Sequence, residues 1–181
     1  FSMGGGAARA VVPSVGVLDF AIVRNGKEIG SQVYKFEAAP EGLAVNVQTR
    51  INFRLGFVSV HRFNHDSREL WHGNRLVALS SSTSEKNIVM GRTKHKVAVD
   101  TGVDDLNVLT DDSSWQAPSS AIPASLWNEK LVESRTLIDT VDGEKLAVNV
   151  ESLGDDIIVV KGQQLSTHYY RLSGDMKREL W

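Results

Sequence analysis

Residues 43–55 alternate strictly between two kinds of side chain. The odd positions are apolar or Thr, and the even positions are polar or small, as at Asn46 and Arg50. A period of two is the signature of a β-strand with one buried and one wetted face. At about 3.3 Å per residue such a strand runs ~40 Å, and strands of that length are typical of sheets that curve around a core or cavity. We therefore expect the odd face, including Phe53, to belong to the core.

The segment after this strand is dense in histidine and tryptophan, and its orientation depends on the junction at Gly56. If Leu55 and Gly56 form a two-residue hairpin loop, Phe53 pairs with Val58 and the histidines lie on the polar face. If Gly56 only kinks a continuing strand, the histidines face inward. We favour the hairpin because Val58 and Val60 then join the apolar face.

Turn signals separate short β-capable runs along the rest of the chain. Asn25-Gly26, between residues 15–23 and 29–37, is a strong hairpin signal because a type I′ turn requires positive φ at both central residues. Later runs are bounded by turns that contain Gly, Asp or Asn. They cover residues 74–83, 88–99, 103–109, 144–150, 157–161, 165–172 and 177–181.

These elements predict a mainly β fold, a single-domain antiparallel curved sheet that closes as a β-barrel or stays open as a half-barrel. One short helix is expected near 125–131, with Ser125 as its N-cap. Residues 15–181 are expected to form the β-barrel-like domain and residues 1–14 a flexible N-terminus. Phe1-Ser-Met is typical of an expression scar, and the Gly/Ala stretch after it of the neighbourhood of a removed signal peptide.

Composition excludes several classes of function. The 181 residues are enough to bury a core without covalent staples, and a net charge of −2 indicates neither a nucleic-acid surface nor a polybasic membrane anchor. The chain has no cysteine, so disulfides, thiolate chemistry and cysteine-based zinc sites are excluded. No run of about 18 apolar residues occurs, and any membrane association is therefore expected to be peripheral.

His61, His65 and Glu69 follow one another at intervals of four residues. On a helix they would form one stripe suited to a metal, but in a strand such neighbours lie about 13 Å apart, so we predict neither a metal site nor a cofactor. His65 and Glu69 can still meet across a turn at residues 66–68, where the carboxylate would orient the imidazole and raise its pKa for acid–base work. The alternative is a structural hydrogen bond or a solvated pair. Residues 80–84 are hydroxyl-rich without a nucleophile-elbow motif and are expected to form a solvent-facing loop.

Five short motifs occur in a fixed order along the chain. They are Val23-Arg-Asn-Gly-Lys-Glu-Ile-Gly30, Leu55-Gly-Phe57, His61-Arg-Phe-Asn-His65-x3-Glu69-x-Trp71, Pro123-x2-Leu-Trp127-Asn128 and Tyr170-Arg-Leu-x-Gly174. Together they resemble an uncharacterised family of exported, mostly proteobacterial, β-rich proteins of unknown function, over most of residues 17–181. The resemblance implies a periplasmic or otherwise extracytoplasmic location and gives weight to the His-x3-Glu-x-Trp segment. The family continues past the position of Trp181, which is consistent with a chain that is cut short there.

We expect a non-enzymatic, extracytoplasmic protein that binds an apolar or amphipathic, lipid-like molecule between its concave sheet and residues 111–131. The long strand, the tryptophans and the lack of a catalytic signature support this hypothesis. The expected ligand-binding residues are Arg62, His65, Glu69, Trp71, Trp127 and Asn128. One alternative is an enzyme that uses a His65/Glu69 acid–base pair, with Arg62 holding an anionic group. Another is an envelope structural or protein-interaction module, and the sequence leaves the oligomeric state open.

Overall fold

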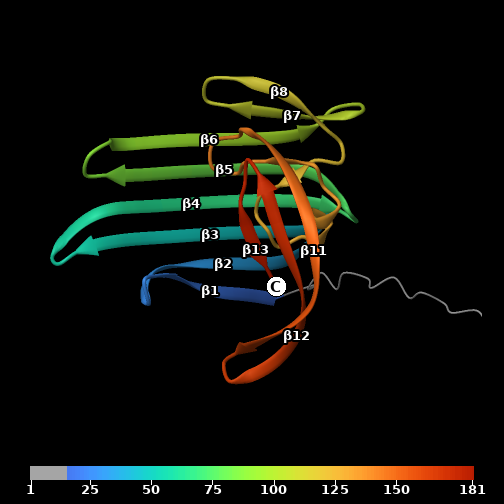
Figure 1. Cartoon of the computed structure of the whole chain (residues 1–181). Helices are drawn as coiled ribbons and strands as arrows, with labels where there is room; N and C mark the ends of the chain where they lie inside the picture. Colours follow the sequence, from blue (N-terminus) through green and yellow to red (C-terminus); the bar gives the residue numbers. More distant parts are fainter. Residues whose placement is uncertain (1–15) are drawn as a thin grey trace, which may run out of the picture.

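The computed structural model describes residues 16–181, so the predicted flexible segment 1–14 lies outside the described residues (Figure 1). The first sheet has eight antiparallel strands paired in chain order: β1 (Gly16–Arg24), β2 (Lys27–Ala39), β3 (Gly42–Leu55), β4 (Val58–His72), β5 (Arg75–Asn87), β6 (Gly91–Thr101), β7 (Asp105–Thr110) and β8 (Ser114–Pro118). The second sheet has five strands in the spatial order β13 (Arg178–Leu180), β12 (Gln163–Gly174), β11 (Lys145–Val160), β10 (Thr136–Ile138) and β9 (Ile122–Pro123). A 3₁₀ turn, η1 (Glu129–Val132), lies between β9 and β10.

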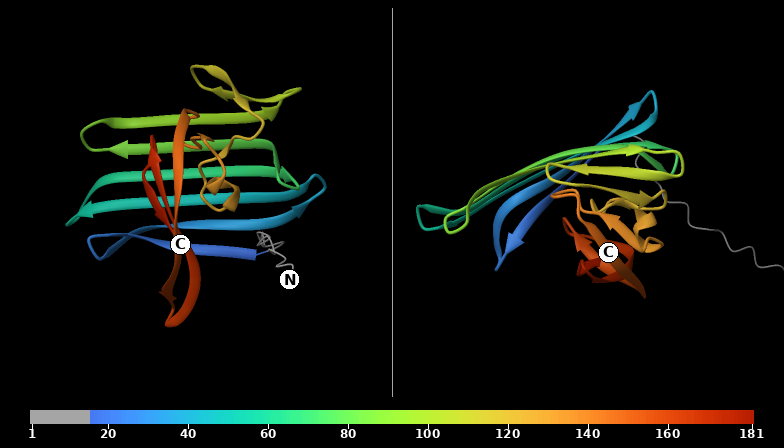
Figure 2. Two further views of the ribbon diagram at one scale, coloured as in Figure 1. Left: turned by 45° about the vertical axis from the view of Figure 1, so that its right-hand side comes forward. Right: turned by 90° about the horizontal axis from the view of Figure 1, so that it is seen from above.

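The second sheet crosses the concave face of the first one. Its long strands β11 and β12 run steeply across β2–β6, near the end where β4 turns into β5 (Figures 1 and 2). The opposite end of the large sheet extends beyond this cover. Because β1 and β8 are the unpaired edges of the large sheet, it stays open. The predicted mainly β, antiparallel curved sheet is thus confirmed in its half-barrel form.

The first hairpin has the predicted turn. Asn25 and Gly26 adopt φ values of 51° and 74°, as a type I′ turn requires at both central positions. A side chain on Gly26 would meet no steric obstacle, so the positive φ alone explains the glycine there.

The junction after β3 is a hairpin, as predicted, but the predicted register is wrong. Leu55 pairs with Val58 around a loop of Gly56 and Phe57, and Arg54 pairs with Ser59. The next pair is Phe53 with His61, so Val60 is an extra residue in β4. Such a β-bulge reverses which face the following side chains take. The odd-numbered residues of β4 therefore share the inward face of β3, and the histidines do not lie on the polar face.

The core forms where the two layers overlap. One row of inward residues runs directly across six neighbouring strands and is almost completely buried: Phe36, Val45, Glu69, Leu79, Val99 and Val108. Apolar side chains of the second layer pack against this row, among them Leu137, Ile138 and Leu172. An ionisable side chain, Glu69, thus lies in the middle of an apolar row, and its hydrogen bonds and burial determine its chemistry.

The hydroxyl-rich residues 80–84 lie within β5, so the prediction of a loop is wrong. Ser81 and Thr83 are buried, and their hydroxyls donate to the backbone oxygens of Thr140, at 2.6 Å, and Val141, at 3.1 Å. These bonds fix the segment that joins β10 to β11 onto the middle of the large sheet. The cover ends there, and the concave face continues without it.

The predicted short helix near 125–131 is a single 3₁₀ turn, η1. Its N-cap is Asn128, whose side-chain oxygen accepts from the backbone N–H of Lys130 at 3.0 Å, and the predicted cap at Ser125 is wrong. In the part of the chain that the structure describes, no helix is both long and apolar enough to cross a bilayer.

Candidate functional site

Glu69, Trp71 and Trp127 form a closed cluster between the two layers. Glu69 and Trp71 lie on the inward face of β4, and Trp127 comes from the segment between β9 and η1. Both indole N–H groups donate to the same carboxyl oxygen, Oε2 of Glu69, at 2.9 Å each. The Trp127 ring meets the rings of Trp71 and Phe36 edge-on, with centroids 5.4 Å apart in both pairs. The carboxyl therefore joins the second layer to the large sheet.

Burial controls the protonation of this cluster. Glu69 is completely buried, and desolvation raises its pKa, although hydrogen bonding from Ser125, Trp127 and Trp71 opposes the rise. Its other oxygen, Oε1, has no hydrogen-bond partner of normal geometry among residues 16–181. Burial and the nearby Glu69 also raise the pKa of Tyr34, whose hydroxyl donates to the backbone oxygen of Ser125 at 2.8 Å. A carboxyl closed off in this way holds the layers together and offers no surface to a ligand.

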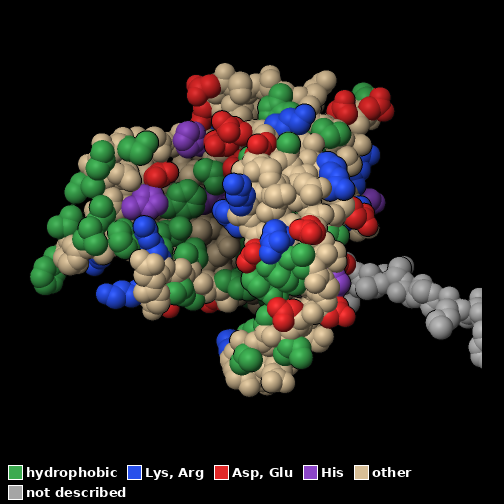
Figure 3. Space-filling view, in the orientation of Figure 1, with side chains coloured by type: hydrophobic (Ala, Val, Ile, Leu, Met, Phe, Trp, Pro, Cys, Tyr) green, Lys and Arg blue, Asp and Glu red, His purple; other side chains and the backbone are tan. Residues whose placement is uncertain are grey.

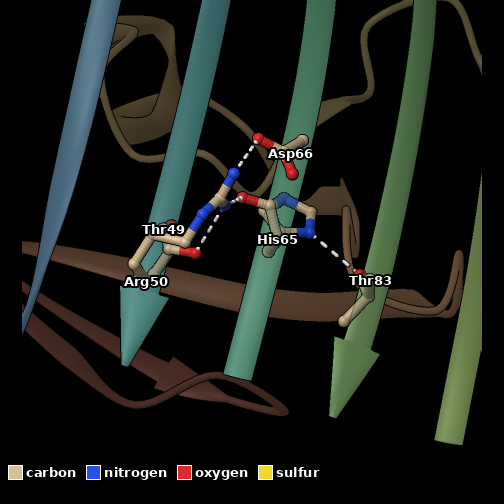
Figure 4. A network of polar contacts seen from close by, with 5 residues as sticks. All are labelled: Thr49, Arg50, His65, Asp66 and Thr83. Carbon is tan, nitrogen blue, oxygen red and sulfur yellow. Dashed lines mark hydrogen bonds and ion pairs between the residues drawn. The ribbon is translucent and has the colours of Figure 1, made fainter. Parts of the chain in front are cut away.

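His65 lies at the border of the covered region, on the inward face of β4 (Figure 4). Its Nδ1 is 2.9 Å from the Thr83 hydroxyl, which itself donates to the backbone oxygen of Val141. Since the hydroxyl proton is used there, Nδ1 carries the imidazole proton and Nε2 is the basic nitrogen. Burial lowers the pKa of His65, against a smaller opposing effect of Asp66. His65 is therefore held neutral as a structural donor.

The predicted direct pair of His65 and Glu69 is wrong. His65 bonds Thr83, while Glu69 accepts from the two indoles. The expected rise in the histidine pKa is also wrong, because burial lowers it. Two residues four positions apart on one strand face the same side but lie about 13 Å apart, and the strand does not turn between them.

Arg62 and Asn128, two of the predicted ligand-binding residues, are not part of the cluster of Glu69, Trp71 and Trp127. Arg62 has the opposite parity on β4 and lies on the convex face, directly across from Lys86 of β5. Asn128 is occupied as the cap of η1. Of the six predicted residues, the structure brings together Glu69, Trp71 and Trp127, and it does so in the core.

The uncovered end of the concave face is a different environment, which we call the open concave surface. Its apolar part comes from β1, β3 and β4, and comprises Phe20, Ile22, Ile51, Phe53 and Phe63. Phe20 is 51% exposed, and the other four are half-buried. Figure 3 shows hydrophobic side chains gathered at this end of the large sheet, beside the crossing layer.

The polar part of the open concave surface lies on β4–β6. His61 Nε2 is 2.9 Å from Glu85 Oε1, and both side chains are about one-third exposed. His95 lies across from Thr83 in the adjoining row. The pair of His61 and Glu85 joins residues 24 positions apart, so only the register of β4 with β5 reveals it. The described residues contain no group of three or more His, Cys, Asp or Glu side chains that would hold a metal ion.

A separate cleft lies at the opposite end of the sheet. It has a volume of about 640 Å³ and is bounded by the β4–β5 turn and by residues 118–122 and 130–136. Its lining mixes polar and apolar side chains, with positive charge from Arg75, Lys130 and Arg135 and negative charge from Glu133. None of His65, Glu69, Trp71 or Trp127 lines it. Side chains packed around the tryptophans fill the inner part of the predicted site between the sheet and residues 111–131, and this edge cleft, which residues 118–122 and 130 of the same segment border, lies outside it.

The open, curved antiparallel sheet with a second sheet across its concave face defines a β-barrel-like protein. It is similar to the crystal structure of a β-barrel-like protein of domain of unknown function DUF1849 from Brucella abortus. The TM-score is 0.54 with 9% sequence identity, and the match covers 91% of this chain and 84% of that one. At this identity the likeness shows the fold alone. The chain belongs to the family described as domain of unknown function DUF6134, whose model matches residues 20–181. No curated protein matches the sequence.

Proposed function

We propose that this protein binds an apolar or amphipathic, lipid-like molecule on the open concave surface. The observation that carries the proposal is that the inward face continues past the crossing layer and keeps its apolar side chains there. Phe63, Ile51 and Ile22 lie in one cross-strand row beyond His65 and the end of the cover. When no ligand is bound, this apolar row contacts water, and covering it with an apolar group would lower the free energy of the system.

The open concave surface has an apolar part and a polar part side by side, which favours an amphipathic ligand over a purely apolar one. Apolar side chains occupy the β1, β3 and β4 part, and the polar pair of His61 and Glu85 lies beside them on β4 and β5. A molecule lying across the strands would place its chain against Phe53 and Phe63 and its polar group near the imidazole. Burial of apolar area contributes about 25 cal/mol per Å², so one acyl chain would supply most of the affinity.

The proposed surface differs from the one expected from the sequence. The tryptophans that suggested an apolar pocket are used in packing, since Trp71 is 1% exposed and Trp127 bonds Glu69. The ligand residues that we now propose are Phe20, Phe53, His61 and Phe63. None of them is needed to seal the core, because each lies outside the overlap of the two layers or at its border.

Titration with a long-chain fatty acid that carries a fluorophore tests the proposal. Replacement of one contacting ring, Phe63→Ser, should weaken binding about tenfold, the effect of removing roughly 1.4 kcal/mol of apolar contact. The matched control is Ile157→Ser, which removes an exposed apolar side chain from β11, outside the surface. Undetectable binding by the unaltered protein, or equal affinity of both variants, would contradict the proposal.

We also propose an extracytoplasmic location, supported by the motif resemblance. Fractionation of a native bacterial host, followed with an antibody, is expected to recover the protein with periplasmic markers. Recovery with cytoplasmic markers would overturn this part of the proposal. The ligand-binding proposal does not depend on the result.

A further inference from the structure

We infer that the end of the large sheet formed by the β3–β4 and β5–β6 hairpins docks onto an anionic lipid surface. The residues involved differ from those of the open concave surface, so this inference goes beyond the proposed function. It rests on apolar side chains at the hairpin tips and on a row of cations directly behind them that have no ion-pair partner among residues 16–181.

The hairpin tips carry apolar side chains with almost no cover. Phe57 is 103% exposed, Val89 88% and Met90 81%. Three more exposed apolar residues flank them: Leu55, Val58 and Ile88. The two hairpins are neighbours, because β4 pairs with β5 and the Ile88 N–H donates to the Val60 oxygen at 3.0 Å. Figure 3 shows this apolar end protruding from the molecule. Such a contiguous projecting patch is unusual on a soluble surface and marks an interaction site.

A row of cations crosses the convex face just behind the tips. Arg62, Lys86 and Arg92 are direct cross-strand neighbours on β4, β5 and β6. Like charges placed opposite one another destabilise a sheet, and an anionic partner would relieve their repulsion. The ion pairs within residues 16–181 use other basic groups, so none of these three side chains has a carboxylate within 4.0 Å.

Further basic residues surround the same end. Arg54 precedes the β3–β4 turn, Lys94 follows the β5–β6 turn, and Arg24 and Lys27 flank the β1–β2 turn. The nearby carboxylates are Glu85, bonded to His61, Asp66, bonded to Arg50, and Glu28 of β2. Because the whole chain has a net charge of −2, this positive end reflects an uneven distribution of charge over the molecule. That distribution would orient the molecule tip-first toward an anionic surface.

The chemistry of the end selects a membrane over a second copy of the chain. Two copies that met through these tips would bring their cations together, whereas acidic lipids supply negative headgroups and an apolar layer at adjoining depths. Exposed Phe, Leu, Val and Met side chains would enter the boundary between headgroups and acyl chains. Each basic residue near an anionic surface contributes roughly fivefold to binding, and salt screens this contribution.

Vesicle co-sedimentation tests the inference. The unaltered protein should bind vesicles that contain phosphatidylglycerol much more strongly than pure phosphatidylcholine vesicles, and added salt should weaken the binding. The double variant Phe57→Asp/Met90→Asp should lose tenfold or more of the affinity, as should Lys86→Glu/Arg92→Glu. All four side chains are exposed, so both proteins should fold normally, which circular dichroism checks.

Matched controls come from the second sheet. Ile157→Asp/Val159→Asp introduces the same two negative charges at exposed apolar positions of β11, and Lys145→Glu/Lys177→Glu reverses two exposed cations of the second-sheet region. Neither should weaken vesicle binding more than twofold. Absence of binding by the unaltered protein, equal losses in tip and control variants, or a soluble oligomer that the tip variant abolishes would each overturn the inference.

The docking inference and the ligand-binding proposal can be tested independently. Phe57→Asp/Met90→Asp should keep its affinity for the fluorescent fatty acid, and Phe63→Ser should keep its affinity for vesicles. If the tip variant lost both activities while remaining folded, the tips would belong to the ligand site, and a separate docking surface would be wrong.

Discussion

The part of strand β4 that follows the bulge at Val60 alternates regularly, but its two ends have different surroundings. In residues 65–71, every inward side chain is buried under the second sheet. In residues 61–63, the inward side chains His61 and Phe63 remain half-exposed, because the cover ends before them. The alternation fixes which side chains face inward, and the second layer decides which of them become core. One strand therefore supplies both a packing surface and a candidate binding surface.

Polar groups behave differently in the two halves. In the covered half, Ser81, Thr83 and Glu69 each bond to the second layer, and these bonds attach it to the large sheet. In the uncovered half, His61 and Glu85 bond only to each other in the described chain and remain accessible. Hydrogen-bonding capacity is used for assembly on one side and is available to a ligand on the other.

Trp71→Ala should give the largest effect. Its side chain is 1% exposed and contacts the Trp127 ring, so the variant should lose about 3–5 kcal/mol of unfolding free energy, the range for deleting a buried aromatic ring. Urea unfolding measures the loss. Trp181→Ala is the control, because that ring is 51% exposed, and it should lose less than ~1 kcal/mol. Equal losses would remove the distinction between covered and uncovered rings.

Trp127→Phe should give an intermediate effect. It keeps most of the ring but removes one of the two donors to the buried Glu69 carboxyl, a loss of about 1–3 kcal/mol. Trp115→Phe is the matched control, because its indole donates at 2.8 Å to a backbone oxygen, that of Gly143, from a half-buried position. A smaller effect for Trp127 than for Trp115 would contradict the role of Glu69 as the link between layers.

Phe53→Ala should give a smaller effect than alternation alone predicts. The sequence pattern assigns Phe53 to the core, but the ring is half-buried and its face is covered by the Arg24 guanidinium, 4.8 Å from the centroid. We expect a loss of about 1 kcal/mol in urea unfolding. A loss of 3 kcal/mol or more would show that the uncovered end is packed like the core.

The last stability prediction concerns pH. Burial raises the folded pKa of Glu69 above its unfolded value of about 4.3, so the folded state binds more protons between these two values. The contribution of Glu69 to the free energy of unfolding is therefore complete below its unfolded pKa and is lost as pH rises through its folded pKa. Glu69→Gln should remove this loss, and its stability relative to the unaltered protein should rise with pH across that window.

The contribution of His65 to stability changes with pH in the opposite direction, so a His65 variant serves as the control for Glu69→Gln. Burial lowers its pKa, so its effect is present above the unfolded value of about 6.5 and is lost as pH falls through the folded value. His65→Gln should weaken the acid-side loss and leave the Glu69 slope intact. If Glu69→Gln and His65→Gln altered the same slope, the two groups would be coupled after all.

The sequence predicted the fold well because the fold depends on local signals. Strand alternation and turn residues such as Asn25-Gly26 indicated an antiparallel sheet with short connections, and the structure has that architecture. The register after Gly56 was not predictable, because the extra residue Val60 has no special sequence signature. Residues 80–84 were misread for a similar reason, since buried hydroxyls look like a loop until their partners at 140–141 are known.

The candidate site was predictable only in part. The His-x3-Glu-x-Trp segment directed the ligand-site prediction to Glu69 and Trp71, which a distant segment buries as packing groups. Arg62 lies on the convex face, away from the predicted site, because the bulge in β4 reverses which residues of the strand face inward. The open concave surface was missed because its members come from five strands, β1 and β3–β6, and the extent of the cover is a long-range property.

Photo-crosslinking with a fatty acid that carries a diazirine on its chain tests the central claim most directly. After irradiation and proteolysis, mass spectrometry locates the modified residues. Labels should concentrate on the peptides that contain Phe20, Phe53 and Phe63, and excess unlabelled fatty acid should abolish them. Labels confined to the edge cleft by Arg75, or spread over the surface without competition, would contradict the account.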